Sequence, residues 1–153
     1  MAKRPAEPRW LSRVVVDAIH TEQLREHGGL PGIRDETALE SALGRAQQKW
    51  HYAERTDVAL LAAAYGFGLV KNYPYRDGNK RIGFLAIVTF LGVNGYDFEV
   101  TDAEVIAVML ALADGRVSEE ALADWIRTHS AKRSDVRTNR VRQNRVHRKG
   151  TEK

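Results

Sequence analysis

The hydrophobic positions along most of the chain recur three or four residues apart, and this spacing predicts an all-α protein. Val15, Val16, Ile19 and Leu24 show it in the first expected helix, which begins at Ser12. The helices are expected over residues 12–28, 35–43, 58–70, 79–93, 101–113 and 118–126. Outside them, the residues from 96 to 100 indicate a short β element.

Two of these helices, 58–70 and 79–93, are apolar on nearly every face, which is typical of helices buried at the centre of a domain. Pro74 disfavours the α conformation in the residue before it, so the first of the two must stop near Tyr73. The pattern therefore predicts a central helix-loop-helix inside a shell of amphipathic helices.

The chain has 153 residues, of which 43% are hydrophobic and 29% are charged, and this suits one domain with its own core. It has no cysteine, which excludes disulfide bonds and thiolate metal sites. The first residues lack the apolar run of a secretory leader, and no stretch approaches the length of a membrane-spanning helix. These features predict a cytoplasmic protein that makes no contact with a membrane.

The net charge of +4 is unevenly distributed, because residues 131–153 contain nine Lys or Arg and two acidic residues. This tail carries +7, which leaves −3 for residues 1–130. The tail lacks apolar periodicity, so we expect a folded domain over 1–130 and a disordered, basic tail over 131–153. Its charge leaves three roles open: a solubilising end, docking on an acidic partner, or contact with nucleic acid. The tail has no aromatic residue for base stacking, which disfavours contact with nucleic acid.

The loop between the two apolar helices, residues 72–81, carries the candidate chemistry. Gly78 permits a close approach to the backbone, and the first amides of a helix that starts at Asn79 have no partners within that helix. An anion is therefore expected at this helix start. Lys80 and Arg81 add two positive charges, and a guanidinium can bind phosphate oxygens in a forked geometry. These residues predict a polyphosphate site.

Asp77 lies beside that site, where a carboxylate would repel phosphate unless a cation stood between them. Mg²⁺ is the ion that proteins usually hold with one carboxylate and phosphate oxygens, so Asp77 is the candidate metal ligand. From residue types alone, a simple turn over 77–79 that caps the next helix, with Lys80 and Arg81 solvated, is at least as good an interpretation.

Residues 73–81 resemble the signature of the Fic/Doc superfamily, His-Pro-Phe-x-Asp/Glu-Gly-Asn followed by Gly-Arg in Fic proteins or by Lys-Arg in Doc proteins. Lys80 and Arg81 give the form of the Doc, or death-on-curing, branch. Phe84 stands where typical Fic proteins have a second arginine, which argues against ordinary AMP transfer. Segments upstream are also similar to Doc-type sequences, and the resemblance covers about residues 10–128.

The resemblance implies a compact, all-α Fic/Doc domain with the signature on its central helix-loop-helix, ATP as donor and Mg²⁺ as cofactor. It implies a toxin that passes the γ-phosphoryl group of ATP to a threonine of elongation factor Tu, stops translation, and pairs with a cognate antitoxin protein. Gly78 and Asn79 would line the anion hole, Lys80 and Arg81 would hold phosphates, and Asp77 would hold Mg²⁺ or orient the acceptor. The alternatives are AMP transfer and an inactive module that binds nucleotide and a partner.

Tyr73 stands where the family has the histidine that serves as a base. An imidazole with an ordinary pKa near 6.5 accepts a proton at neutral pH, whereas a phenol with an ordinary pKa near 10 is ionised in about one molecule per thousand. Tyr73, whether natural or engineered, therefore predicts weakened or abolished activity with nucleotide binding intact. A working base or a modified residue at this position is the least favoured interpretation. Tyr75, in place of the family's phenylalanine, is expected to pack into the core.

Two of the five histidines, and the three tryptophans, also carry expectations. His20 and His27 fall seven residues apart near acidic residues, and they are expected to be solvated or capping side chains rather than metal ligands. Trp10, Trp50 and Trp125 are expected to anchor helices through their large apolar area.

Overall fold

The computed structural model describes residues 6–133, and these residues form six helices and two short strands. In chain order the elements are α1 (Arg13–His27), α2 (Glu36–Tyr52), α3 (Val58–Asn72), α4 (Asn79–Val93), β1 (Tyr96–Phe98), α5 (Asp102–Ala113), α6 (Glu119–His129) and β2 (Ser130–Lys132). The predicted all-α class is confirmed, and every expected helix is present. α2 extends past its expected end at 43, because buried residues continue at helical spacing through Ala46 and Trp50.

Five of the six helices begin at a side chain that caps them. The oxygens of Ser12, Asp35, Asp57, Thr101 and Ser118 each accept a hydrogen bond from the backbone N–H three residues further on. Such caps satisfy amides that have no partner within the helix. They confirm the helix starts that the sequence predicts. α4 begins without a side-chain cap.

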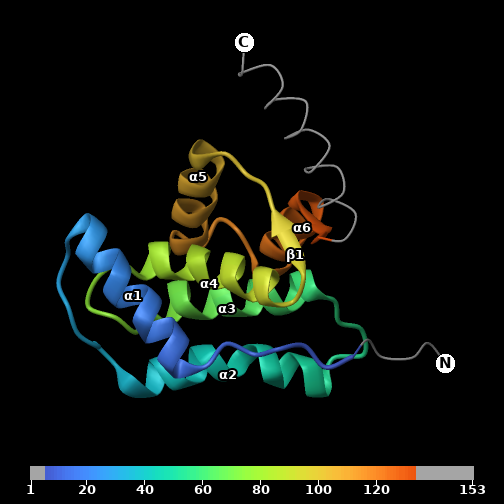
Figure 1. The fold of residues 1–153 in the computed structure, drawn as a ribbon, viewed down its shortest axis with the longest axis horizontal. Coiled ribbons are helices and arrows are strands. Elements are labelled where there is room, and N and C mark those ends of the chain that lie inside the picture. The colour runs from blue at the N-terminus through green and yellow to red at the C-terminus, as the bar shows by residue number, and fades with distance from the viewer. Residues whose placement is uncertain (1–5, 134–153) are drawn as a thin grey trace, which may run out of the picture.

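α3 and α4 lie at the centre of the domain, with α2 along one side and α5 and α6 along the other, while α1 crosses the end of the pair (Figure 1). Their burial explains why their sequences are apolar on every face. The largest fully buried side chains include Tyr65, Leu69, Ile82, Ile87, Phe90, Leu91, Leu112, Leu122 and Ile126.

Two glycines set how closely α3 and α4 approach each other. A Cβ atom on Gly66 would lie 2.5 Å from Cδ1 of Ile87, and one on Gly83 would lie 2.7 Å from Cγ2 of Val70. Either contact is closer than packed carbon atoms allow, so any side chain at these positions would force the helices apart. The hairpin that carries the motif loop is therefore a tightly packed unit.

β1 and β2 form a two-stranded antiparallel sheet in which Tyr96 faces Lys132 and Phe98 faces Ser130. β1 lies within the segment where the sequence indicates a β element. Its partner is a strand that the sequence analysis did not expect, and it places residues 131 and 132, assigned to the tail by the sequence, in a defined element. The rest of the predicted tail, residues 134–153, lies outside the described residues.

Aromatic side chains fasten the outer segments to the central pair. The Trp10 ring stacks on Phe90 with centroids 6.1 Å apart, and it meets Trp50 edge to face at 6.3 Å. The Trp125 ring meets Phe98 edge to face at 5.2 Å, which joins α6 to β1. The three tryptophans are thus anchors, as predicted.

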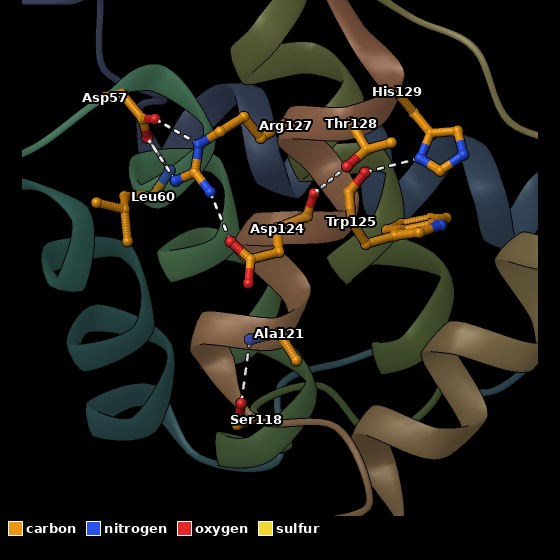
Figure 2. Close-up of polar contacts among 9 residues, drawn as sticks. All are labelled: Asp57, Leu60, Ser118, Ala121, Asp124, Trp125, Arg127, Thr128 and His129. Atoms are coloured by element: carbon orange, nitrogen blue, oxygen red, sulfur yellow. Dashed lines mark hydrogen bonds and ion pairs between the residues drawn. The ribbon is translucent and has the colours of Figure 1, made fainter.

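At the end of the hairpin where α3 begins, charged groups pair with one another (Figure 2). Arg127 on α6 donates two hydrogen bonds to the carboxylate of Asp57, at 2.7 and 3.2 Å, and one to Asp124 at 2.7 Å. Asn94, directly after α4, exchanges two hydrogen bonds with the backbone of Arg9, at 2.8 and 3.0 Å. Together these contacts link α3, α4, α6 and the N-terminal segment.

Among residues 6–133, no helix combines the length and apolar character that crossing a lipid bilayer requires.

Candidate active site

A cavity of about 410 Å³ opens at the other end of the hairpin, where α3 ends and α4 begins. All six residues that the sequence predicts for the site contribute to its wall. These are Tyr73, Asp77, Gly78, Asn79, Lys80 and Arg81. The structure therefore brings the predicted residues together around one space, while the role of each in binding or transfer stays a prediction.

The start of α4 forms the polar part of the wall. Gly78 has φ +80° and ψ 17°, a left-handed conformation that a residue with a side chain adopts at a cost. The first hydrogen bond of α4 runs from Ile82 N–H to the carbonyl of Gly78, at 2.9 Å. The amides of residues 79–81 thus have no carbonyl partner within α4, and the positive end of the helix dipole lies at the cavity.

Lys80 and Arg81 are both exposed beside these amides. In the part of the chain that the structure describes, no hydrogen bond or ion pair involves either side chain. Two unneutralised cations and a set of free amides at one helix start give the cavity a positive potential. The arrangement is suited to an anion with several oxygens, such as a polyphosphate.

The Asp77 carboxylate is held at the rim by two backbone amides. Oδ1 accepts from Gly78 N–H at 2.9 Å, and Oδ2 accepts from Leu30 N–H at 3.1 Å. Each carboxylate oxygen has about two acceptor positions, so one on each remains available. The group therefore suits a single carboxylate ligand of Mg²⁺, whose other ligands come from phosphate and water. Residues 6–133 hold no cluster of three or more His, Cys, Asp or Glu side chains that could bind a metal unaided.

The Asn79 side chain is buried and forms hydrogen bonds within the motif loop. It is 3% exposed, its Nδ2 donates to the carbonyl of Tyr75 at 2.9 Å, and its Oδ1 accepts from Tyr75 N–H at 3.0 Å. Both ends of the amide are therefore used to fix the motif loop. What Asn79 can offer a ligand is its backbone N–H, and the side chain positions the loop.

Tyr73 ends α3 in a left-handed conformation, with φ 53° and ψ 52°, and it is the one residue other than glycine with positive φ in the described chain. Such a conformation is uncommon for a bulky residue and has to be held by its surroundings. Arg34 supplies the restraint, because its guanidinium donates to the carbonyls of Tyr73 at 2.6 Å and Asn72 at 2.8 Å. The same guanidinium lies 5.9 Å from the centroid of the Tyr73 ring.

The segment between α1 and α2 holds the motif loop along its length. Ile33 and Tyr75 form an isolated antiparallel bridge. The amides of Arg34 and Asp35 donate to the carbonyl of Pro74 at 2.7 and 3.1 Å. The loop thus forms backbone hydrogen bonds as a strand would, which explains how irregular backbone keeps one shape.

His20 is a site residue that the sequence analysis missed. It is 5% exposed, its Nε2 lies 2.8 Å from the carbonyl oxygen of Asp77, and its ring stacks on Tyr75 at a centroid distance of 3.8 Å. The expectation of a solvated or capping histidine is therefore wrong for His20. Its contacts lie 57 residues away in the sequence, so helical spacing within α1 could not indicate them.

Tyr75, expected in the core, is 2% exposed, and its hydroxyl donates to Asp17 of α1 at 2.6 Å. Burial and the hydrogen bond to this carboxylate raise the pKa of Tyr75 well above its ordinary value, so the phenol stays protonated. With His20, this contact attaches α1 to the motif loop.

The opposite wall of the cavity is apolar. It consists of one residue of α4 and four of α5, namely Phe84, Val105, Ile106, Met109 and Leu110. Ile106 is 68% exposed and Leu110 is 46% exposed. The cavity therefore offers a cationic side to charged groups and an apolar side to uncharged parts of a ligand or partner.

Comparison with known proteins identifies relatives of this chain. Residues 10–91, more than half of the chain, match the family described as Fic/DOC. The chain is 31% identical over 120 residues to Protein kinase doc of Escherichia phage P1, and the aligned region covers 78% of this chain and 94% of that protein. Both matches include the motif loop, and the second confirms the resemblance to the Doc branch.

Proposed function

Since this chain belongs to the Fic/DOC family, we propose that it has the architecture of a Doc-like protein kinase, which transfers the γ-phosphoryl group of ATP to a hydroxyl group of another protein. The observation that carries the proposal is the cavity at the start of α4. It combines free helix amides with Lys80 and Arg81 on one side, and it has the Asp77 carboxylate at its rim.

In this proposal the residues of the cavity position the donor. The amides of residues 79–81 and the guanidinium of Arg81 bind phosphate oxygens, and Lys80 adds a compact charge. Asp77 would hold Mg²⁺, and the bound ion would neutralise part of the charge of the phosphates. Phosphoryl transfer depends mainly on positioning and charge neutralisation, so a site made of amides and cations is chemically adequate for it.

The transfer of phosphate rather than AMP is supported by Phe84, which lines the cavity where Fic proteins have a second arginine. A phenyl ring offers no hydrogen bonds to a further phosphate group. The side of the cavity that contains Phe84 is apolar throughout. We therefore propose one cationic region for the transferred group.

A second candidate function, binding of nucleotide and partner without transfer, is favoured by Tyr73. In the family signature this position holds the base that takes the acceptor's proton, and a phenol is a weak base at neutral pH. Tyr73 does not belong to the start of α4, so the phosphate site is complete without it. The proposal is therefore a kinase whose activity is weakened by Tyr73.

The physiological role that we propose is that of a toxin in a toxin–antitoxin pair, which acts in the cytoplasm on a translation factor similar to elongation factor Tu. A separate antitoxin protein would restrain it. The proposal rests on the resemblance of the chain to the Doc branch and on its 31% identity to Protein kinase doc of phage P1.

The test compares the chain that carries Tyr73 with Tyr73→His. Each is incubated with a purified translation factor, Mg²⁺ and ATP labelled at either the γ or the α phosphate. We expect Tyr73→His to label the factor from γ-labelled ATP and to slow the growth of a host that expresses it. Label from α-labelled ATP would identify an AMP transferase instead. Binding of ATP by both forms, with no label and no growth defect in either, would favour the binding module.

A further inference from the structure

The feature that carries a further inference is the hydroxyl group of Tyr73. The Tyr73 side chain is 50% exposed and contributes to the same cavity wall as Lys80 and Arg81. Within residues 6–133, none of the hydrogen bonds of the structure engages this hydroxyl. By contrast, the buried phenols of Tyr65 and Tyr75 are both occupied, by Leu11 N–H and by the Asp17 carboxylate.

The backbone at Tyr73 is held in place although its conformation is unfavourable. Two hydrogen bonds from Arg34 fix the carbonyls of residues 72 and 73, and the Arg34 guanidinium lies over the ring. The backbone that carries the ring beside the cavity is therefore held by a neighbouring segment. A hydroxyl without a hydrogen bond on a restrained backbone is a well-positioned acceptor, because less freedom is lost when it reacts.

We propose that Tyr73 is a site of self-phosphorylation. The inference rests on the proposed function, in which the γ-phosphate of ATP lies over the start of α4. The residue at position 73 then has to reach the acceptor hydroxyl, whose oxygen must come within about 3.5 Å of the phosphorus atom. A histidine at that position takes a proton from the acceptor. A tyrosine carries an acceptor oxygen of its own on a side chain that lines the same cavity.

The reaction is balanced without a further reagent. A bond forms between the Tyr73 phenolic oxygen and the γ-phosphorus, and the bond from that phosphorus to the β,γ-bridging oxygen breaks. ADP leaves, and the phenolic proton passes to solvent. A phenol, with an ordinary pKa near 10, releases its proton more easily than the aliphatic hydroxyl of a threonine, so self-transfer depends less on a separate base than transfer to a threonine does.

The product would limit its own formation. A phosphotyrosine carries between one and two negative charges at neutral pH, and its oxygens are strong hydrogen-bond acceptors. Lys80 and Arg81 line the same cavity, and no hydrogen bond or ion pair of the described residues involves either side chain, so both are available to pair with it. A modified chain would thus occupy its own anion site, and self-labelling would stop at one phosphate per chain with weaker binding of ATP afterwards.

The experiment incubates the full chain with Mg²⁺ and γ-labelled ATP and maps the label by peptide mass spectrometry. We expect one phosphate per chain on Tyr73, at a rate per chain that does not change with protein concentration. Tyr73→Phe should abolish the label. Tyr52→Phe is the matched control, because Tyr52 is 86% exposed on α2 and does not line the cavity, so its loss should leave labelling unchanged.

Binding of ATP is measured in parallel by calorimetry, so that the two proposals fail separately. If ATP binds and Tyr73 gains no phosphate, self-phosphorylation is rejected and the nucleotide site stands. If ATP does not bind, both the proposed function and this inference are rejected. Label spread over Tyr52 as well as Tyr73, or label on Tyr73 from α-labelled ATP, would also overturn the inference.

Discussion

Each end of the α3–α4 hairpin contains a helix start whose first amides have no partner within the helix, and the two ends differ in what lies beside those amides. At the closed end, which we define by Asp57, Asn94 and Arg127, a carboxylate caps the start of α3, and an arginine from α6 pairs with that carboxylate. At the open end, the loop of residues 73–81, the start of α4 has no side-chain cap, and two cations stand beside its free amides. One end pairs its charges within the domain, whereas among the described residues the other leaves two cations and the first helix amides without a partner.

The closed end contributes to stability, and its charges cancel locally. The open end keeps its backbone fixed through Asn79, Arg34 and His20, while the groups that face the cavity stay uncompensated. A domain that fixes a loop this firmly and leaves its cations without partners is prepared for a ligand of opposite charge. Four experiments test this contrast between an end that we expect to stabilise the fold and an end that we expect to bind a ligand.

The largest effect is expected from removing both cations of the open end. Lys80→Ala combined with Arg81→Ala should weaken the binding of ATP with Mg²⁺ by about 1000-fold, since a hydrogen bond to a charged group contributes about 1.5–3 kcal/mol. Titration calorimetry measures the affinity, and urea unfolding should show little change in stability. Arg25→Ala with Arg116→Ala, two exposed arginines elsewhere, is the control; a similar loss of affinity in it would show that the effect comes from net charge alone.

Next in size is a matched pair of asparagines that flank α4. Asn79→Ala breaks two hydrogen bonds to backbone groups and Asn94→Ala breaks three, and each should reduce the free energy of unfolding by about 2–3 kcal/mol. Only Asn79→Ala should also weaken ATP binding, because only it releases the motif loop. The contrast fails if both variants bind ATP equally well under conditions where both are folded.

Gly78→Ala tests the backbone conformation of the open end. A Cβ atom there would lie 3.7 Å from His20 Nε2, an ordinary contact, so the cost comes from the positive φ and should be about 1–2 kcal/mol. The variant should fold, with a reduced urea midpoint, and should bind ATP several-fold more weakly as the loop relaxes. Unchanged stability would mean that the left-handed turn is not required.

The smallest effect is expected at the closed end, from Arg127→Ala. Burial opposes the charge of Asp57, but hydrogen bonds from Arg127 and from Leu60 N–H outweigh it and hold the pKa of Asp57 below its ordinary value. Both partners are about half exposed, so the lost stability should be below about 1 kcal/mol. ATP binding should not change.

The effect of Arg127→Ala also has a defined dependence on pH. Because the folded pKa of Asp57 is lowered, its contribution to stability is present above the unfolded value and is lost as pH falls through the folded value. The difference between the natural chain and Arg127→Ala should therefore be constant near neutral pH and should shrink below about pH 4. A difference that grows in acid would contradict this assignment.

The sequence predicts best the features that depend on neighbouring residues. The caps at Asp35, Thr101 and Ser118 involve groups three residues apart, and all were predicted and found. The site residues from Asp77 to Arg81 lie in one continuous segment at the start of α4, so their gathering around one cavity required only that the two apolar helices form a hairpin. Local chemistry is sufficient for such features.

The missed features depend on distant partners. Nothing in the local sequence indicates that Arg34 reaches the carbonyl of Tyr73, that His20 contacts Asp77, or that β2 pairs with β1, because each contact requires the tertiary fold. The Asn79 side chain is instructive in another way. The motif indicates that Asn79 is important. Only the three-dimensional structure shows that its side-chain amide forms hydrogen bonds with the backbone of Tyr75.

The unequal attachment of the two cavity walls has a consequence for how such a protein changes over time. Gly66 and Gly83 allow the close packing of the hairpin, so the wall that we propose for phosphate tolerates little alteration. α5 forms the other wall and has 12 residues, of which Met109 and Leu112 alone are fully buried. Mutations on the outer surface of α5 can accumulate without disturbing the start of α4. We therefore expect selection for new protein targets to act on this helix first.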